Sequence, residues 1–149
     1  MRAVAQRVAR ARITVAGEPV GEMGAGLLAL VGVARADGPA EAALLARKLV
    51  HLRIFPGARG GMDASLLESG GTLGVVSQFT LLGDARQGRR PSWAEAAPPE
   101  QAEPLLDALC AAARELGAPV VTGRFRATMA VELVNEGPVT ILLDTERRF

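Results

Sequence analysis

Apolar and polar residues alternate along the first part of the chain, Arg2–Val15, and this period of two predicts a long β-strand. Residues 16–19 (AGEP), which follow it, are typical of a turn. The next apolar run, residues 26–33 (GLLALVGV), is almost unbroken, as in a buried strand. Together these segments predict a hairpin at the start of the chain.

Two later segments place their apolar residues on one side of a helix. The first helix is predicted from Gly38 and Pro39, with the proline in its first position, to about Leu52. The second is predicted over residues 100–116, with Gly117 as its C-cap. The residues expected on the buried sides are Ala42, Leu45, Leu49 and Leu52 in the first helix, and Leu105, Leu109, Ala112 and Leu116 in the second.

The remaining apolar segments are short and lie between clusters of turn residues, as strands do. Strands and helices mixed in this way predict an α/β fold, in a single domain over residues 1–149. We expect residues 145–149 to form a loose tail and residues 84–92 a polar, basic loop. The additional strands are predicted at residues 52–55, 72–82, 120–122, 127–134 and 138–143.

The composition restricts the classes of protein to which the chain can belong. Its 149 residues are 49% hydrophobic and 22% charged, a balance that excludes collagen, coiled coils and intrinsically disordered chains. No apolar run approaches the ~20 residues of a membrane helix, and the N-terminal residues lack the apolar segment of a secretion signal. We therefore expect no membrane association and a cytoplasmic location. The net charge of +1 means that a polyanion would have to be contacted by a local patch.

The usual catalytic groups of hydrolases are missing. His51 is the only histidine, and it faces away from the apolar side of its helix, so we interpret it as a surface residue. Cys110 is the only cysteine, and it lies beside the leucines of the second helix, where a buried structural thiol is expected. Ser-His-Asp and Cys-His catalysis are thereby excluded. Since no metal-binding motif is present either, we expect no metal and no cofactor.

Three polar features interrupt the apolar segments. Arg7 lies among alanines on one side of the first strand. If its side chain points inward, its five donors need hydrogen-bond partners. The alternative is a structural arginine whose charged end reaches solvent at the edge of the sheet. Residues 77–80 (SQFT) end a buried strand, where polar groups and free backbone N–H groups can form an oxyanion hole or simply cap the strand. Residues 135–138 (NEGP) lie in a predicted turn, where the Gly-Pro bond is a candidate cis peptide although trans is the more common form.

Two separated motifs resemble the signature pair of the D-aminoacyl-tRNA deacylases: VVSQFTL at residues 75–81 and NEGPVT at residues 135–140. The resemblance extends over residues 1–144. It implies a compact three-layer α/β/β domain with mixed, largely antiparallel sheets, and a homodimer with its active sites at the subunit interface. Shorter matches are MRAVAQRV at residues 1–8, LVGV at 30–33, LRIF at 52–55 and GRRPSW at 88–93.

The resemblance also implies a reaction. Such deacylases hydrolyse the ester between a D-amino acid and the 3′-terminal adenosine of tRNA, and remove glycine from the wrong tRNA. They spare L-aminoacyl-tRNA, which makes the reaction a chiral proofreading step in translation. By this resemblance Ser77, Gln78, Phe79 and Thr80 would line the ester without a cofactor. The ribose 2′-OH of the substrate would assist, with Thr80 as a positioning group or, alternatively, as a nucleophile.

A second group of residues is implied in chiral selection. Gly137 and Pro138, joined by a cis peptide bond, would extend from one subunit into the pocket of the other. Their carbonyl oxygens would fill the space that an L side chain needs, so that selection works by exclusion. Arg7 would hold this element, and Met129 and Asn135 match positions of the family near the pocket.

The chain departs from the family pattern at two places. Arg126 replaces the usual glycine of a Phe-Gly-Ala segment, and Glu136 replaces the aspartate before Gly-Pro. Arg126, together with Arg86, Arg89 and Arg90 of the polar loop, is a candidate contact for tRNA phosphates. The alternative interpretation of the loop arginines is a solvated surface.

Two other functions are compatible with such a fold. One is a non-catalytic RNA-binding homodimer, but such a protein would not need the intact SQFT and Gly-Pro motifs. The other is a hydrolase of free small esters, which a requirement for tRNA would distinguish from a deacylase.

Overall fold

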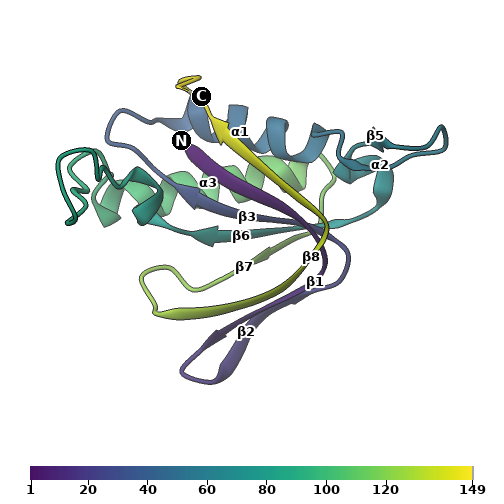
Figure 1. Cartoon of the computed structure of the whole chain (residues 1–149), viewed down its shortest axis with the longest axis horizontal. Helices are drawn as coiled ribbons and strands as arrows, with labels where there is room; N and C mark the ends of the chain where they lie inside the picture. Colours follow the sequence, from purple (N-terminus) through teal and green to yellow (C-terminus); the bar gives the residue numbers. More distant parts are fainter. Residues whose placement is uncertain (149) are drawn as a thin grey trace.

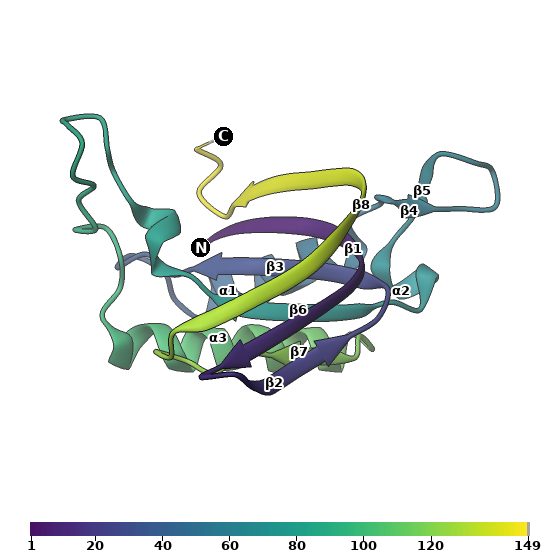
Figure 2. The same ribbon diagram turned by 60° about the horizontal axis from the view of Figure 1, so that its bottom comes forward.

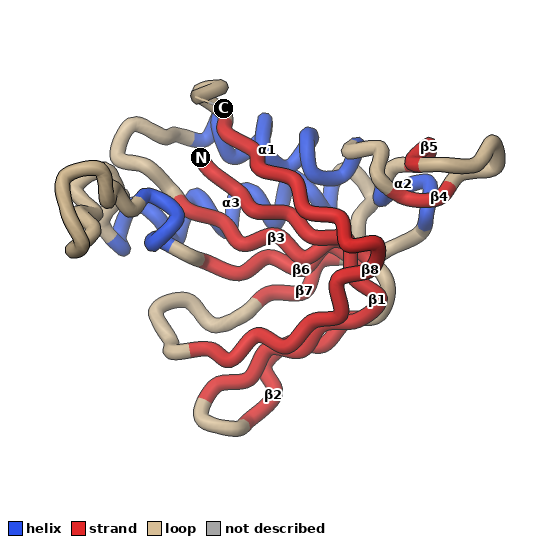
Figure 3. The backbone as a smooth tube through the Cα atoms, in the orientation of Figure 1, coloured by secondary structure: helices blue, strands red, loops and turns tan. Residues whose placement is uncertain are grey.

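The structure, a computed structural model, describes residues 1–148 (Figure 1). Strands and helices are mixed along the chain, and two long helices separate groups of strands (Figure 3). In chain order the elements are β1 (Arg2–Val15), β2 (Glu18–Met23), β3 (Gly26–Gly32), α1 (Pro39–His51), β4 (Phe55–Pro56), β5 (Met62–Ala64), α2 (Leu66–Ser69), β6 (Thr72–Ser77), the 3-10 helix η1 (Phe79–Leu82), α3 (Pro99–Glu115), β7 (Val120–Thr122) and β8 (Met129–Asp144).

A mixed sheet with the strand order β2-β1-β3-β6-β7 forms the centre of the molecule, and β8 also pairs with β1. β3, β6 and β7 run parallel, whereas β1 is antiparallel to β2, β3 and β8. The connection from β3 to β6 contains α1, as a parallel pair requires. Both long helices lie on the same face of this sheet (Figures 1 and 2). The predicted α/β class is therefore confirmed.

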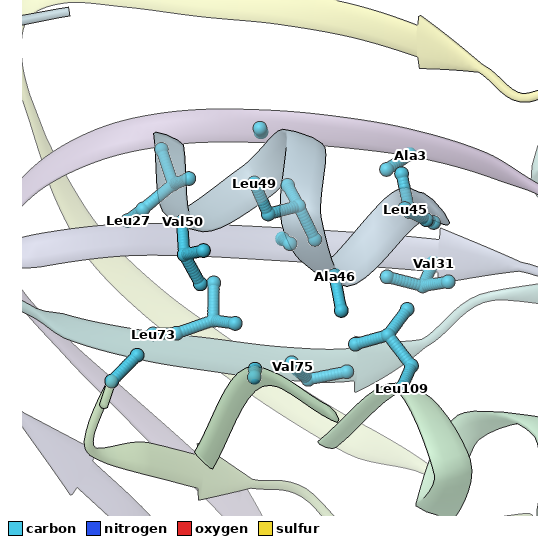
Figure 4. Packing of buried hydrophobic residues seen from close by; sticks show 14 of the residues in the cluster. Ala3, Leu27, Val31, Leu45, Ala46, Leu49, Val50, Leu73, Val75 and Leu109 are labelled. Atoms are coloured by element: carbon cyan, nitrogen blue, oxygen red, sulfur yellow. The ribbon is translucent and has the colours of Figure 1, made fainter. Parts of the chain in front are cut away.

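The larger core lies between the helices and the sheet. Leu45 and Leu49 of α1 and Leu109 of α3 meet Leu27 of β3 and Leu73 of β6, and all five are fully buried (Figure 4). Burial of one such side chain contributes about 1.5–3 kcal/mol. This core therefore fixes the helices against β3 and β6, and β6 leads into the predicted catalytic segment.

A second, smaller core lies on the opposite face of the sheet. β1 and β8 are long and bend, so that part of each strand folds back across that face (Figure 2). Val8, Ala11, Ile13, Met23, Leu28 and Val76 are buried there, with Met129, Val131 and Leu133 packed against them.

β-Bulges allow both long strands to pass from one core to the other. Ala3 and Ala5 of β1 pack in the helix-side core, whereas Ala11 and Ile13 pack in the second core. Between these pairs the register with β8 shifts by one residue at Ala9, and one extra residue reverses the side of every residue after it. Alternate residues of β1 are expected to lie on one covered face along the whole strand. This expectation is wrong beyond Ala9, where the same alternation faces the second core.

β8 is one continuous strand rather than two. The prediction of strands at residues 127–134 and 138–143 joined by a tight turn is wrong, because residues 136–139 bulge out while the chain continues along β1. Between the pairs Gln6–Thr140 and Val8–Asn135, Arg7 alone stands opposite this bulge. A turn motif read from sequence does not distinguish a reversal of the chain from a wide bulge.

Three smaller predictions also differ from the structure. The sequence does not predict β2, since Pro19 suggests a turn. The proline is tolerated because β2 lies at the edge of the sheet. β6 ends at Ser77 rather than residue 82, because η1 follows it. Leu116 is 40% exposed rather than buried, because it caps α3 after the last helical residue.

The two ends of the chain are joined near α1. The Met1 ammonium group is buried and donates to Asp37 Oδ1 at 2.5 Å, and the Thr145 N–H donates to the Met1 carbonyl at 2.9 Å. The first residue of the predicted loose tail is thus held in place, and Phe149 lies outside the described residues. No helix within residues 1–148 is both long and apolar enough to cross a membrane.

Candidate active site

A cavity of about 660 Å³ opens between the end of β6, η1, the start of α3 and the segment that enters β8. All four residues of the predicted catalytic segment line it, together with Met129 and Arg126. Its apolar part is lined by residues that include Val31, Val33, Val76, Ala97, Leu106 and Phe125. The structure thus brings together two parts of the predicted site that are about fifty residues apart in sequence.

The predicted catalytic segment begins where the ladder between β3 and β6 ends. The Gln78 N–H donates to the Val31 carbonyl at 2.7 Å, and the chain then turns into η1. A Cβ on Gly32 would lie 2.9 Å from the Gln78 carbonyl oxygen, so the close approach of β3 depends on glycine. The Gln78 side-chain amide donates to Thr80 Oγ1 at 3.1 Å, which links the two polar side chains.

Arg2 connects η1 to the ends of the two long strands. Its Nη1 donates to the Leu81 carbonyl at 3.2 Å, and its Nε donates to Asp144 Oδ2 at 3.2 Å. Asp144 is buried at the end of β8. One guanidinium group therefore positions the segment that lines the cavity.

The backbone at the start of η1 leaves donors without partners. The N–H groups of Phe79 and Thr80 donate to no group among residues 1–148, as expected for the first residues of a 3-10 helix. Two adjacent backbone N–H groups beside a cavity are able to bind an oxyanion. The segment therefore has two donors of the kind that can stabilise an oxyanion.

The described lining of the cavity holds no acid or base that could transfer a proton near neutral pH. Arg126 is its only ionisable residue. His51 is exposed on α1, as predicted. Cys110 is buried, as predicted, and desolvation raises the pKa of its thiol above the ordinary value. Neither residue lines this cavity.

Arg7 donates to one backbone carbonyl of the β8 bulge and to one outside it. Its Nε donates to the Glu136 carbonyl at 3.0 Å, and its Nη1 donates to the Ile54 carbonyl at 2.6 Å. Arg7 is half-buried, and two of its five donors bind backbone carbonyls. It thereby joins the bulge to the segment that follows α1.

Asn135 closes the bulge from within. Its Oδ1 accepts from the Val139 N–H at 2.9 Å, and its Nδ2 donates to Thr140 Oγ1 at 3.1 Å. The Gly137–Pro138 peptide bond is cis, and Gly137 has a φ of +135°. A Cβ on Gly137 would lie 2.7 Å from Val139 Cγ2, so only glycine fits there. Asn135 thus braces the bulge, a contact that sequence reasoning missed.

The bulge and the cavity do not meet within one chain. Gly137 and Pro138 are exposed, and neither they nor Arg7 line the cavity. Met129 of the cavity is eight residues from Gly137 along β8, and at about 3.3 Å per residue this corresponds to roughly 25 Å of strand. The predicted site residues therefore form two separate groups.

The polar loop lies next to the cavity. Backbone hydrogen bonds of 2.8 Å in both directions join Asp84 and Ser92 at its base. Arg86 donates to both Asp84 carboxylate oxygens and holds the pKa of that carboxyl well below its ordinary value. Arg89 and Arg90 are exposed and form no ion pair with any residue in the described part of the chain.

Comparison with known proteins assigns these features to a family. The model of the D-Tyr-tRNA(Tyr) deacylase family matches residues 4–144. The chain belongs to this family. A D-aminoacyl-tRNA deacylase of Anaeromyxobacter dehalogenans is 59% identical over the full length of both chains. Another, of Roseiflexus, is 57% identical and covers 97% of this chain and 94% of that protein. The predicted membership among the D-aminoacyl-tRNA deacylases is confirmed.

Two solved structures resemble this member of the deacylase family. The c-Myc DNA unwinding element binding protein is 36% identical, with a TM-score of 0.92, and the match covers 97% of this chain and 99% of that one. A probable eukaryotic D-amino acid tRNA deacylase has a TM-score of 0.80 at 18% identity, over 95% and 97% of the two chains. This second similarity shows the fold alone.

The departure of this deacylase-family chain at Arg126 has a structural counterpart. Arg126 adopts a φ of +61°, in the left-handed region that favours glycine. It lies in a turn that the Ala127 N–H closes by donating to the Arg124 carbonyl at 3.2 Å. The family's usual glycine suits this conformation, whereas arginine adopts it at a cost of about 1–2 kcal/mol.

Proposed function

We propose that this protein hydrolyses D-aminoacyl-tRNA, and tRNA mischarged with glycine, to the free amino acid and tRNA. It rejects L-aminoacyl-tRNA and so acts as a chiral proofreading enzyme in the cytoplasm, without a metal or cofactor. Membership in the deacylase family supports the activity. The observation that carries the proposal is the cavity that joins Ser77, Gln78, Phe79 and Thr80 to a lining with no acid or base.

In this proposal the protein supplies donors and position, and the substrate supplies the hydroxyl that assists. The N–H groups of Phe79 and Thr80 hold the ester carbonyl oxygen, on which negative charge develops when water attacks. The bond from the carbonyl carbon to the ribose oxygen breaks, and that oxygen takes the proton lost by the water. The adjacent 2′-OH relays this proton, and Gln78 holds Thr80 as a positioning group.

The chiral filter is proposed to come from a second subunit. Since Gly137 and Pro138 are exposed and lie apart from the cavity of their own chain, a partner can deliver them to it. Each three-layer α/β/β subunit would complete the site of the other in a homodimer with two active sites. The carbonyl oxygens of the bulge, held by Arg7 and Asn135, would then occupy the space of an L side chain.

Four arginines are proposed to contact the phosphates of the acceptor stem. Arg126 lies at the cavity, and Arg89 and Arg90 extend from the neighbouring loop without an ion pair among the described residues. Arg86 would contribute less, because Asp84 already neutralises it. With a net charge of only +1, the protein needs such a local patch to bind a polyanion.

Hydrolysis of two matched esters tests the proposal against the other candidate functions. Purified protein is incubated with D-Tyr-tRNA and with D-tyrosine ethyl ester, and release of D-tyrosine is followed. We expect rapid release from the tRNA and release at the buffer rate from the ethyl ester. Equal release from both esters would indicate a hydrolase of small esters. Binding of the tRNA without any release would indicate a non-catalytic RNA-binding protein.

A further inference from the structure

Two aromatic side chains form an exposed pair beside the cavity. The ring centroids of Phe79 and Trp93 are 5.8 Å apart with an interplanar angle of 64°, an edge-to-face arrangement. Phe79 is 59% exposed and Trp93 is 41% exposed, although most aromatic surface in a protein of this size is buried. The catalytic segment therefore presents an aromatic surface toward solvent.

The pair lies between the cavity and the arginine loop. Phe79 lines the cavity, and Trp93 packs over the end of η1, where a Cβ on Gly83 would lie 3.2 Å from its Nε1. Trp93 directly follows Ser92, which is held at the base of the loop that carries Arg89 and Arg90. Cavity, aromatic pair and unpaired arginines thus follow one another along one edge of the described molecule.

We infer that the Phe79–Trp93 pair stacks the base of the nucleotide that precedes the 3′-terminal adenosine of the substrate. This inference rests on the proposed function, which places the terminal aminoacyl ester in the cavity. The next nucleotide of a single-stranded 3′ end would then lie within reach of Phe79, which lines the cavity and is exposed to solvent. Single-stranded nucleic acid is bound by aromatic side chains that stack on bases, with nearby arginines on the phosphates.

The charges around the pair favour a polyanion over a protein partner. Asp84 is neutralised by Arg86. Glu95 shares Arg148 with Glu146, at 3.8 Å and 2.5 Å, so that one carboxylate is left to set against Arg89 and Arg90. Arg89 and Arg90 therefore leave a positive excess at this edge. A base stacked on the aromatic pair would place its backbone phosphate toward this excess charge.

The test compares Trp93→Ala with wild type on intact D-Tyr-tRNA and on D-Tyr-tRNA that lacks the base of its penultimate nucleotide. Loss of one base–aromatic contact should lower kcat/KM on the intact tRNA roughly 5- to 150-fold. On the abasic tRNA the variant and the wild type should react equally, because the base to be stacked is missing. Trp93→Phe should retain most of the activity, since it keeps an aromatic face.

Leu116→Ala is the matched control, because Leu116 is 40% exposed at the far end of α3. It should change kcat/KM on neither tRNA. Equal loss for Trp93→Ala on both tRNAs, or no loss on either, would overturn the inference. Conversion of the Trp93→Ala protein to monomers in light scattering would overturn it as well, and would assign the pair to a subunit contact. A wild type that does not react with intact D-Tyr-tRNA would instead refute the proposed function.

Wild-type protein alone provides a second measurement that does not depend on how the variant folds. Wild-type kcat/KM should itself fall roughly 5- to 150-fold when the penultimate base is removed. An unchanged value would contradict the inference even if Trp93→Ala is unstable.

Discussion

At the scale of single residues, the candidate site consists largely of backbone groups that a few side chains hold in place. Arg2 holds η1, and Arg7 and Asn135 hold the bulge of β8. None of these three side chains lines the cavity. Substitution of the side chains that hold the bulge should therefore change the specificity of the enzyme although they lie outside the cavity, and substitutions inside the cavity need not abolish its activity.

Replacement of Arg126 by glycine should stabilise the protein. The left-handed φ of +61° costs an L-residue about 1–2 kcal/mol, whereas the freedom of glycine in the unfolded chain costs about 0.5–1 kcal/mol. Urea unfolding of Arg126→Gly should thus give a free energy of unfolding up to about 1.5 kcal/mol above wild type.

Arg124→Gly provides the control for this measurement. Arg124 is exposed in the same turn but does not have a positive φ, so glycine there should lower the free energy of unfolding by about 0.5–1 kcal/mol. Equal changes for the two variants would show that the backbone of Arg126 is not responsible.

Thr80→Ala should keep much of its activity if Thr80 positions the substrate. Thr80 accepts one side-chain hydrogen bond from Gln78, and loss of a contact of this kind costs about 1 kcal/mol, less than tenfold in rate. A tRNA that ends in 2′-deoxyadenosine should instead react at least about a hundredfold more slowly, because the assisting hydroxyl is gone. An inactive alanine variant and a trapped acyl-enzyme on the wild type would assign the nucleophile to Thr80.

At the scale of elements, hydrophobic periodicity predicts α1, α3, β1 and β3 closely. It fails along β1 and β8 after their bulges, because one inserted residue reverses the alternation without changing the composition. The SQFT segment could be found from its polar residues at the end of a buried strand. The bracing role of Asn135 could not be found from the sequence. It depends on a contact with Val139 across the bulge, and the bulge has no distinct sequence signal.

Arg7→Ala should loosen the bulge and weaken the chiral filter. Arg7 makes two hydrogen bonds from a charged group to backbone carbonyls, each worth about 1.5–3 kcal/mol. We expect the ratio of D-Tyr-tRNA to L-Tyr-tRNA hydrolysis to fall at least about tenfold. Arg10→Ala, which removes an exposed arginine of the same strand, should leave the ratio unchanged. A change of similar size in both variants would disprove a specific role for Arg7.

At the scale of the whole molecule, the separation of the cavity from the bulge is the feature that supports the proposed second subunit. Gly137 and Pro138 do not line the cavity of their own chain, and roughly 25 Å of strand separates Gly137 from Met129. A contact that is reciprocal between two copies gives an isologous dimer.

Light scattering should therefore report a mass of about twice 15.5 kDa at the concentrations used for activity. Full activity and full selectivity of a monomer of 15.5 kDa would contradict the shared site.

The measurement that tests the central claim most directly is the rate of deacylation of D-Tyr-tRNA and of L-Tyr-tRNA by the same purified protein. Both substrates carry the same tRNA, the same ester and the same side chain, so that only the configuration at the α-carbon differs. The account predicts rapid hydrolysis of the D-enantiomer and a rate for the L-enantiomer close to that in buffer. Equal rates on the two enantiomers, or no reaction with either, would contradict it.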